Sequence, residues 1–312
     1  MKSLLLWRLG LAHGVADGAT GWLMGDLLLT QDPVQGAIAL LLYNGIAFGG
    51  QALTGLVVDR TNTARLAAWG GLGLLALGLG VAHGSPWMAV LLAGLGSAWF
   101  HPGAGAIATH WAKGQAAPLG IFTAPGVLGL GLGLGWALTD HGNILPGLAL
   151  GIGWIGLGIL PPLAASLNRE PPTCAPRSGM TVLLLGAIFL RSGLWLALQG
   201  RYYPHLGMLL ALTGAAAGGK WLGGYLGDCW GWRNWAIAAT LGAIALGVSP
   251  HWQLHILGAM LLQSTVPITW AAINKTLPPD QTATATGLAL GLAIALSGIW
   301  LLPAINLATV NW

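Results

Sequence analysis

Long apolar stretches follow one another along almost the whole chain, and the polar and charged residues collect in the short segments between them. An apolar stretch of about 20 residues is what an α-helix needs to cross the hydrocarbon core of a membrane. The pattern therefore predicts eleven membrane-spanning helices, with ends good to about three residues. The predicted spans are 3–28, 35–58, 64–83, 87–112, 118–139, 144–166, 179–200, 205–227, 233–249, 252–274 and 283–305.

Residues 168–179 interrupt the apolar pattern with charged, proline and small residues. This segment separates six predicted spans from five. We therefore expect an all-α polytopic membrane protein of two pseudo-symmetric halves, residues 1–167 and 179–312, joined by a cytoplasmic linker at 168–178.

A glycine followed four residues later by an aspartate occurs behind two of the apolar stretches, as Gly55 with Asp59 and as Gly224 with Asp228. The two copies are 169 residues apart. Such a long repeat indicates a duplicated multi-helix unit, and a duplicated helical unit in a membrane favours a transporter with its binding site between the halves.

Composition excludes a water-soluble domain. Hydrophobic residues make up 55% of the chain, charged residues only 6%, and the mean hydropathy is +0.73, whereas about a quarter of the residues of a soluble protein are charged. The two cysteines, Cys174 and Cys229, fall on the predicted cytoplasmic side. A disulfide is not expected there, and two thiols are too few for a metal framework.

The basic residues set the expected topology. With a cytoplasmic N-terminus, eight of them lie at cytoplasmic ends and only Arg201 lies outside, as the positive-inside rule requires. We expect an inner (plasma) membrane protein of prokaryotic type with its C-terminus outside. The basic residues form no cluster, which argues against a nucleic-acid partner. The cytoplasmic set is Lys2, Arg60, Arg65, Lys113, Arg169, Arg177, Arg233 and Lys275.

Polar or ionisable side chains lie near the middle of four predicted spans. A charge at this depth costs about 2.5 kcal/mol or more, so such groups usually face one another or a wet cavity. His13 and Asp17 are four residues apart and therefore share one helix face. These residues are the candidates for function: His13 and Asp17 in the first span, His101 in the fourth, Arg191 in the seventh, and Gln263 and Thr265 in the tenth.

Structural interpretations of the same residues stay open. Asp17 and Arg191 can form a buried ion pair that binds nothing, and each histidine can simply bond a neighbouring carbonyl. Thr265 is typical of hydrogen bonding between membrane helices, and Lys220 is expected to extend toward the cytoplasmic surface. Four deep tryptophans can either pack or offer aromatic faces to a substrate: Trp22, Trp99, Trp195 and Trp270.

Glycines concentrate within the spans, at Gly10, Gly14 and Gly18 in the first and from Gly126 to Gly135 in the fifth. Small residues on one face allow membrane helices to approach closely or to slide past one another. The sequence leaves both interpretations open.

The repeated loop resembles the signature of the major facilitator superfamily. Its first copy holds Gly55, Asp59, Arg60 and Arg65, with Asn62 in place of the usual turn glycine, and its second holds Gly224, Asp228, Gly231 and Arg233. The segment 94–102, which contains His101, and the His13 and Asp17 pair resemble the fosmidomycin-resistance-type drug exporters. The twelfth helix that is usual in the superfamily is not predicted.

The resemblance implies that the first, fourth, seventh and tenth helices line a central cavity. It also implies that Asp59 and Asp228 cap neighbouring helix ends and pair with Arg60, Arg65 or Arg233 to form a cytoplasmic gate.

We therefore expect a proton-coupled antiporter that exports a small organic molecule by alternating access. Asp17 would carry the proton, and His13 and His101 would relay it, because imidazole titrates near physiological pH. Arg191, Gln263, Thr265 and the four deep tryptophans are the candidate substrate contacts. The expected partners are the lipid bilayer, protons and the substrate.

The alternative is a non-transporting scaffold or assembly subunit that binds a membrane-protein partner at the edge without a twelfth helix. An enzyme is not expected, since neither a zinc-protease motif nor a nucleophile elbow is present. We expect no cofactor and no metal, because His101 and His110 lie on opposite faces of one predicted helix and would not share an ion.

Overall fold

The structure is a computed structural model that describes residues 2–139, 142, 144–158, 178–202 and 205–297. All regular elements of these residues are helices. Most of the predicted linker at 168–178, and the end of the predicted last span, lie outside the described residues. The N-terminal half holds α1 (Lys2–Thr30), α2 (Pro33–Asn44), η1 (Gly45–Gly49), α3 (Gln51–Thr61), α4 (Ala64–Val81), α5 (Pro86–Ala112), α6 (Ala117–Leu138) and α7 (Ile144–Gly158).

The C-terminal half continues the helical pattern, and the prediction of six and five spans is confirmed. The segments α2, η1 and α3 together form the second span, and α12, η2 and α13 together form the last. The elements of this half are α8 (Ser178–Tyr202), α9 (Leu206–Trp230), α10 (Trp232–Gly247), α11 (Trp252–Asn274), α12 (Thr282–Gly287), η2 (Leu288–Leu292) and α13 (Ala293–Ser297).

Local sequence explains where the second span begins, bends and ends. The Asp32 carboxylate accepts hydrogen bonds from the amides of Val34 and Gln35, and Pro33 occupies the first turn, which is a favoured helix start. A π-helix, η1, interrupts the span, and a second π-helix, η2, contacts it from the last span. At the far end Asn62 adopts a left-handed φ of 55°, the conformation that usually falls to glycine.

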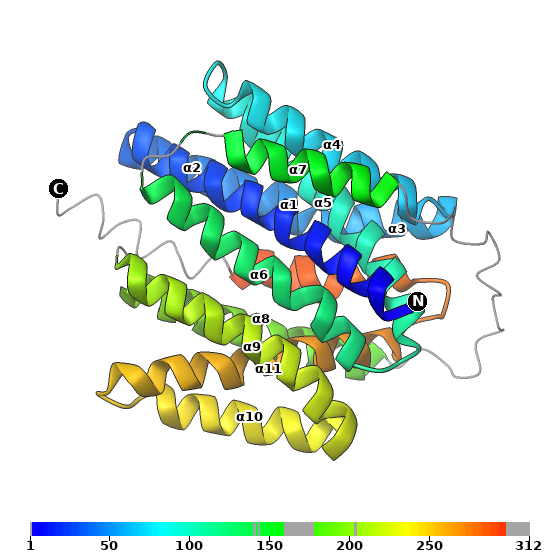
Figure 1. Cartoon of the computed structure of the whole chain (residues 1–312). Coiled ribbons are helices and arrows are strands. Elements are labelled where there is room, and N and C mark those ends of the chain that lie inside the picture. The colour runs from blue at the N-terminus through cyan, green and yellow to red at the C-terminus, as the bar shows by residue number, and fades with distance from the viewer. Residues whose placement is uncertain (1, 140–141, 143, 159–177, 203–204, 298–312) are drawn as a thin grey trace.

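The two halves lie side by side as helical bundles (Figure 1). Within the halves, α1 packs on α6, α4 on α5, and α11 on both α9 and α10. Between the halves, α6 packs on α9 and α12 packs on α3. Helices α1, α5 and α11 supply much of the core, and α5 and α11 are the two most completely buried of the apolar spans.

Glycines bring α1 and α6 into backbone contact. A side chain at Gly129 would collide with the carbonyl of Gly14, and one at Gly133 would collide with the carbonyl of Gly18. The glycines of the first and fifth spans therefore pack against each other, as close approach of membrane helices requires.

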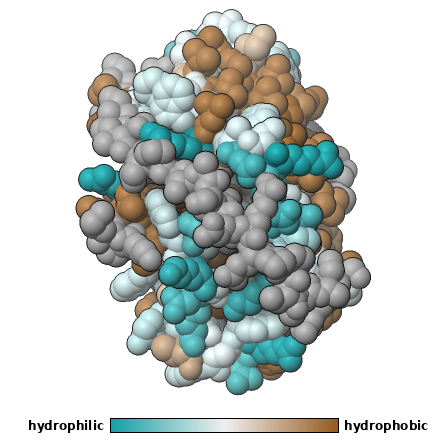
Figure 2. Space-filling view, turned by 90° about the vertical axis from the view of Figure 1, so that its right-hand side faces the viewer, coloured by the Kyte–Doolittle hydropathy of each residue, from teal (hydrophilic) through white to brown (hydrophobic). Residues whose placement is uncertain are grey.

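Apolar side chains cover the outside of the bundle. Leu53, Ile152, Val182 and Val248 are more than two-thirds exposed. Among the described residues, six helices are at least 18 residues long and apolar enough to cross a membrane. Large exposed apolar surfaces mark membrane contact. Hydrophilic residues gather on the end face that Figure 2 presents, next to the N-terminus and the α3–α4 turn in Figure 1. The chain is an integral membrane protein.

Candidate functional site

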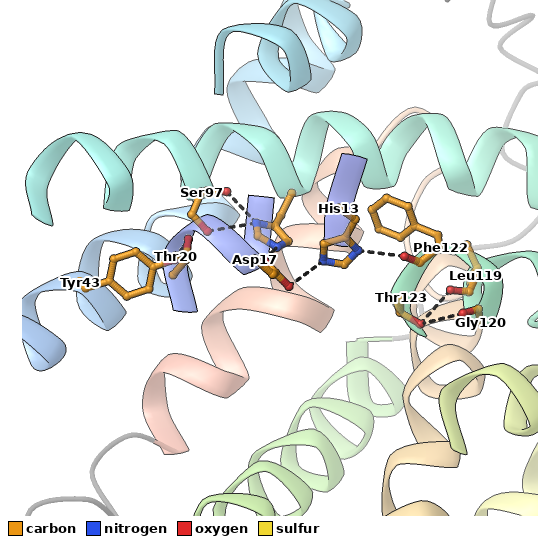
Figure 3. A network of polar contacts seen from close by, with 10 residues as sticks. His13, Asp17, Thr20, Tyr43, Ser97, Leu119, Gly120, Phe122 and Thr123 are labelled. Carbon is orange, nitrogen blue, oxygen red and sulfur yellow. Dashed lines mark hydrogen bonds and ion pairs between the residues drawn. The ribbon is translucent and has the colours of Figure 1, made fainter. Parts of the chain in front are cut away.

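Asp17 contacts two histidines from different helices, and Figure 3 shows it beside His13. Its Oδ2 is 3.2 Å from Nε2 of His13 on α1, and its Oδ1 is 3.2 Å from Nε2 of His101 on α5. His13 and His101 are 4% and 5% exposed. The two imidazoles meet edge to face, with ring centroids 4.9 Å apart. The structure thus joins the three residues into one buried cluster.

Backbone carbonyls fix the orientation of both imidazoles. Nδ1 of His13 is 2.9 Å from the Phe122 carbonyl oxygen, and Nδ1 of His101 is 2.9 Å from the Ser97 carbonyl oxygen. A carbonyl only accepts hydrogen bonds, so each Nδ1 must carry a hydrogen. Each Nε2 contact with Asp17 then needs its own proton, on the imidazole or on the carboxyl, because a bare nitrogen lone pair would repel the carboxylate. The two contacts with Asp17 together therefore require two protons, one for each contact.

Several residues that were not candidates from the sequence surround this cluster. Phe122 stacks on His13 at 4.4 Å between centroids, Ser97 Oγ lies 3.1 Å from Nδ1 of His101, and the Tyr43 hydroxyl donates to Thr20. Helical spacing gave a signal for two of them, because Ser97 precedes His101 by one turn and Thr20 follows Asp17 by three residues. Nothing in the sequence placed Phe122 or Tyr43 beside them.

Arg191 of α8 does not pair with Asp17. Its guanidinium donates to Thr269 Oγ1 of α11 at 3.0 Å, and no ion pair links it to a carboxylate in the described part of the chain. The structural ion pair that the sequence left open is therefore absent, because Asp17 already has a histidine on each carboxylate oxygen. Arg191 is only 7% exposed, so it is a buried cation on the C-terminal half.

Lys220 is a second cation near the interface of the halves. The structure extends α9 to Trp230, three residues beyond the predicted end, which leaves Lys220 ten residues from the helix terminus. The side chain is half-buried and lies in electrostatic range of both Asp17 and Arg191. The longer helix thus places Lys220 three residues farther from the helix end than predicted.

The remaining candidates divide between buried polar groups and packing residues. Gln263 and Thr265 are buried on α11, and the Thr265 hydroxyl bonds a carbonyl of its own helix. Trp22 and Trp270 are fully buried, and Trp270 contacts Phe122. Trp99 packs in a separate small cluster with Val58, and Trp195 is half-buried.

The repeated Gly and Asp motif joins the two halves reciprocally. Asp59 accepts hydrogen bonds from the amides of Ala283 and Thr284, at 2.9 and 2.7 Å, at the start of α12 in the other half. Asp228 accepts from the amides of Ala116 and Ala117, with shortest distances of 2.8 Å, at the start of α6.

The motif glycines make this contact possible. A side chain at Gly55 would collide with the Ala283 carbonyl, and one at Gly224 would collide with the Ala116 carbonyl. Glycine and aspartate are one helical turn apart, so one face of each helix both packs on and caps the facing helix.

Solved structures share this architecture. A crystal structure of the transporter FucP in its outward conformation matches with a TM-score of 0.74 and 14% identity, over 99% of this chain and 92% of that one. A second structure of FucP, the E. coli fucose:proton symporter, matches with a TM-score of 0.71 at 14% identity and the same coverage. This chain has the fold of the major facilitator superfamily.

A crystal structure of the nucleoside transporter NupG matches with a TM-score of 0.58 and 15% identity, over 99% of this chain and 91% of that one. No protein-family model and no curated protein sequence matches the chain. Within the fold, the four polar spans are α1 with Asp17, α5 with His101, α8 with Arg191 and α11 with Gln263.

The partners of Asp59 and Asp228 differ in part from those that the resemblance implied. In the described residues no ion pair joins Asp59 or Asp228 to Arg60 or Arg233. The positive end of a helix dipole and two convergent amides already satisfy each carboxylate, so an arginine is not required. Gly231, in the second copy, has a φ of 84° and provides the turn into α10.

Removing the cap that Asp59 provides is expected to loosen the contact between α3 and the start of α12. We predict that Asp59→Ala raises the thiol-labelling rate of a cysteine introduced at the buried Ala283 by about two- to thirtyfold, because a helix cap contributes about 0.5–2 kcal/mol. The measurement uses a background in which Cys174 and Cys229 are serine. Asp59→Asn, which keeps an acceptor oxygen, is the matched control, and equal labelling of the Ala variant and wild type would contradict the role of the cap.

Proposed function

We propose that this protein is a proton-coupled secondary transporter that exports a small organic molecule by alternating access. The observation that carries the proposal is the His13, Asp17 and His101 cluster. Each of its two Nε2 contacts requires a proton, and the cluster lies at the middle of two spans. Such intramembrane groups form proton relays in pumps and transporters.

Two positive charges near the interface between the two halves favour a substrate with an acidic group. Arg191 and Lys220 are two cations of the C-terminal half, and neither forms an ion pair within the described residues. An uncompensated buried cation is costly, and a bound carboxylate or phosphate would remove that cost. The proposed substrate is therefore a small organic anion, with Thr269 positioning the guanidinium.

Alternating access fits the contacts between the halves. The reciprocal caps of Asp59 and Asp228 hold one end together through a few hydrogen bonds to helix N-termini. Contacts of this strength can open and reform during transport. We propose that this end faces the cytoplasm, in line with the positive-inside bias, and that residues 1–167 rock against 179–312.

The proposals of proton coupling and of export rest on similarity to other transporters as well as on the geometry of the site. FucP is a fucose:proton symporter, so this fold supports proton coupling. The direction proposed here follows the resemblance of segment 94–102 and of His13 with Asp17 to fosmidomycin-resistance-type exporters.

Proteoliposomes with a pH dye in the lumen test the proposal. Small organic anions, each paired with a neutral analogue, are added outside while uptake of each compound is followed. Antiport moves protons out as substrate enters, so the lumen pH should rise. Uptake with a fall in lumen pH would refute antiport, and uptake without a pH change would refute proton coupling. A folded protein that moves none of these compounds would favour the scaffold alternative.

The same assay tests the substrate class. Arg191→Gln should reduce uptake of anions about tenfold or more relative to their neutral analogues, since a hydrogen bond to a charged group contributes about 1.5–3 kcal/mol. Arg191→Lys retains the charge and serves as the matched control. An unchanged preference for anions in Arg191→Gln would exclude the guanidinium as the anion contact.

A further inference from the structure

The buried cluster has the donor set of a transition-metal site. One ligand atom each of His13, Asp17 and His101 lies within 4.8 Å of the other two, and Nε2 of each histidine contacts a carboxylate oxygen of Asp17. We propose that these three residues bind a divalent first-row transition-metal ion, with Zn²⁺ the best match, in the positions that protons otherwise occupy. The proposal goes beyond transport and stands whether or not the protein moves a substrate.

The separations of the donor atoms fit a small ion. Zn²⁺ binds imidazole nitrogen at about 2.0–2.1 Å and carboxylate oxygen at about 2.0–2.2 Å in tetrahedral geometry, which places neighbouring donors about 3.3–3.5 Å apart. The two contacts between Asp17 and the imidazoles are 3.2 Å each. The two contacts use different oxygens, Oδ2 with His13 and Oδ1 with His101, so the ion would bind between the two carboxylate oxygens, with both imidazole nitrogens turning toward it.

The outer contacts of the cluster match those of metal-binding histidines. A ligating histidine almost always donates its second ring N–H to a carbonyl, a carboxylate or water, which aims the other nitrogen at the metal. His13 and His101 both do this through Nδ1, to the carbonyls of Phe122 and Ser97. Stacking of Phe122 on His13 further limits rotation of that ring. Both Nε2 atoms are therefore already directed at Asp17.

The donor types select the class of ion. Two imidazoles and one carboxylate suit Zn²⁺ and its first-row neighbours, whereas Mg²⁺ and Ca²⁺ prefer oxygen ligands throughout. Three protein ligands leave a fourth position for water or for an acidic group of another molecule. No metal was expected from the sequence, because His101 was compared only with His110 on the same predicted helix. The structure instead pairs His101 with two residues of α1.

Cobalt spectroscopy tests the site directly. Purified protein without a polyhistidine tag is titrated with Co²⁺, and the visible absorption of tetrahedral cobalt and its loss on adding Zn²⁺ are recorded. Wild type should bind one ion per chain. His13→Gln and His101→Gln should each lose at least about tenfold in affinity, since even loss of an outer contact costs 10–100-fold. His110→Gln, at an exposed position of the same α5 helix, should bind as wild type does.

A further variant guards against loss of folding. Asp17→Cys keeps a ligand at this position and should add a sulfur-to-cobalt charge-transfer band that wild type, with its own two cysteines, does not show. Absence of Co²⁺ binding in wild type would overturn the proposal. So would a cobalt spectrum that persists in both histidine variants, or Co²⁺ binding by Asp17→Cys without the new band.

Discussion

Replacing Asp17 with Asn is expected to abolish substrate-driven proton movement in proteoliposomes while leaving the protein folded. Asn has nearly the same shape and can still contact both imidazoles, but its amide neither takes up nor releases a proton. The Nε2 atoms of His13 and His101 would then lose the carboxylate that holds protons between them. Substrate uptake should become independent of an imposed pH gradient, and the change in lumen pH should fall to the level of empty vesicles.

Asp32→Asn provides the matched control for this variant. Asp32 undergoes the same chemical change at an exposed position, where it caps α2, and Asn is as good a helix cap as Asp. The control should retain full coupling. If Asp17→Asn still moves protons with substrate at the wild-type ratio, Asp17 is not the proton carrier.

A second large effect is expected on stability, at the crossing of α1 and α6. Gly129→Val should lower the free energy of unfolding by about 3 kcal/mol or more, at the upper end of what overpacking costs. The added carbon atoms would overlap the Gly14 carbonyl, and a backbone atom cannot move aside by changing a rotamer. The readout is the thermal unfolding midpoint in detergent, together with the yield of monodisperse protein.

Gly214→Val separates this collision from the general effect of valine in a helix. Gly214 lies on α9 with open space around the position of its missing side chain, so this variant should unfold close to the wild-type midpoint. The contact interpretation fails if Gly129→Val and Gly214→Val unfold at the same temperature.

Sequence reasoning located the spans and the depth of the polar residues because both depend on position along a single helix. The apolar lengths predicted the helices of all eleven spans as far as the residues are described, and Asn62, which replaces the usual turn glycine, adopts the left-handed conformation. Asp17, His13 and His101 were placed in one layer for the same reason. Depth, however, contains no information on which helices are neighbours at that layer.

The errors follow from this missing lateral information. Arg191 lies at the predicted depth but bonds Thr269 of α11, while Asp17 faces α5. The caps of Asp59 and Asp228 are formed with helices of the opposite half, more than 100 residues away in sequence. No helical periodicity predicts such a contact, which depends on how the halves meet.

The π-helix η1 has a consequence for the register of the second span. A π-turn holds one residue more than an α-turn, and each residue advances the helix face by about 100°. Every residue after η1, including Gly55 and Asp59, therefore faces a direction about 100° away from the one that a continuous α-helix of the same sequence would give it. An α-helical backbone in place of η1, with no change in sequence length, would rotate the Asp59 carboxylate by about 100° away from α12, whereas deletion of one residue between 45 and 49 would leave the carboxylate facing α12. The length of this one turn thus determines where the motif points.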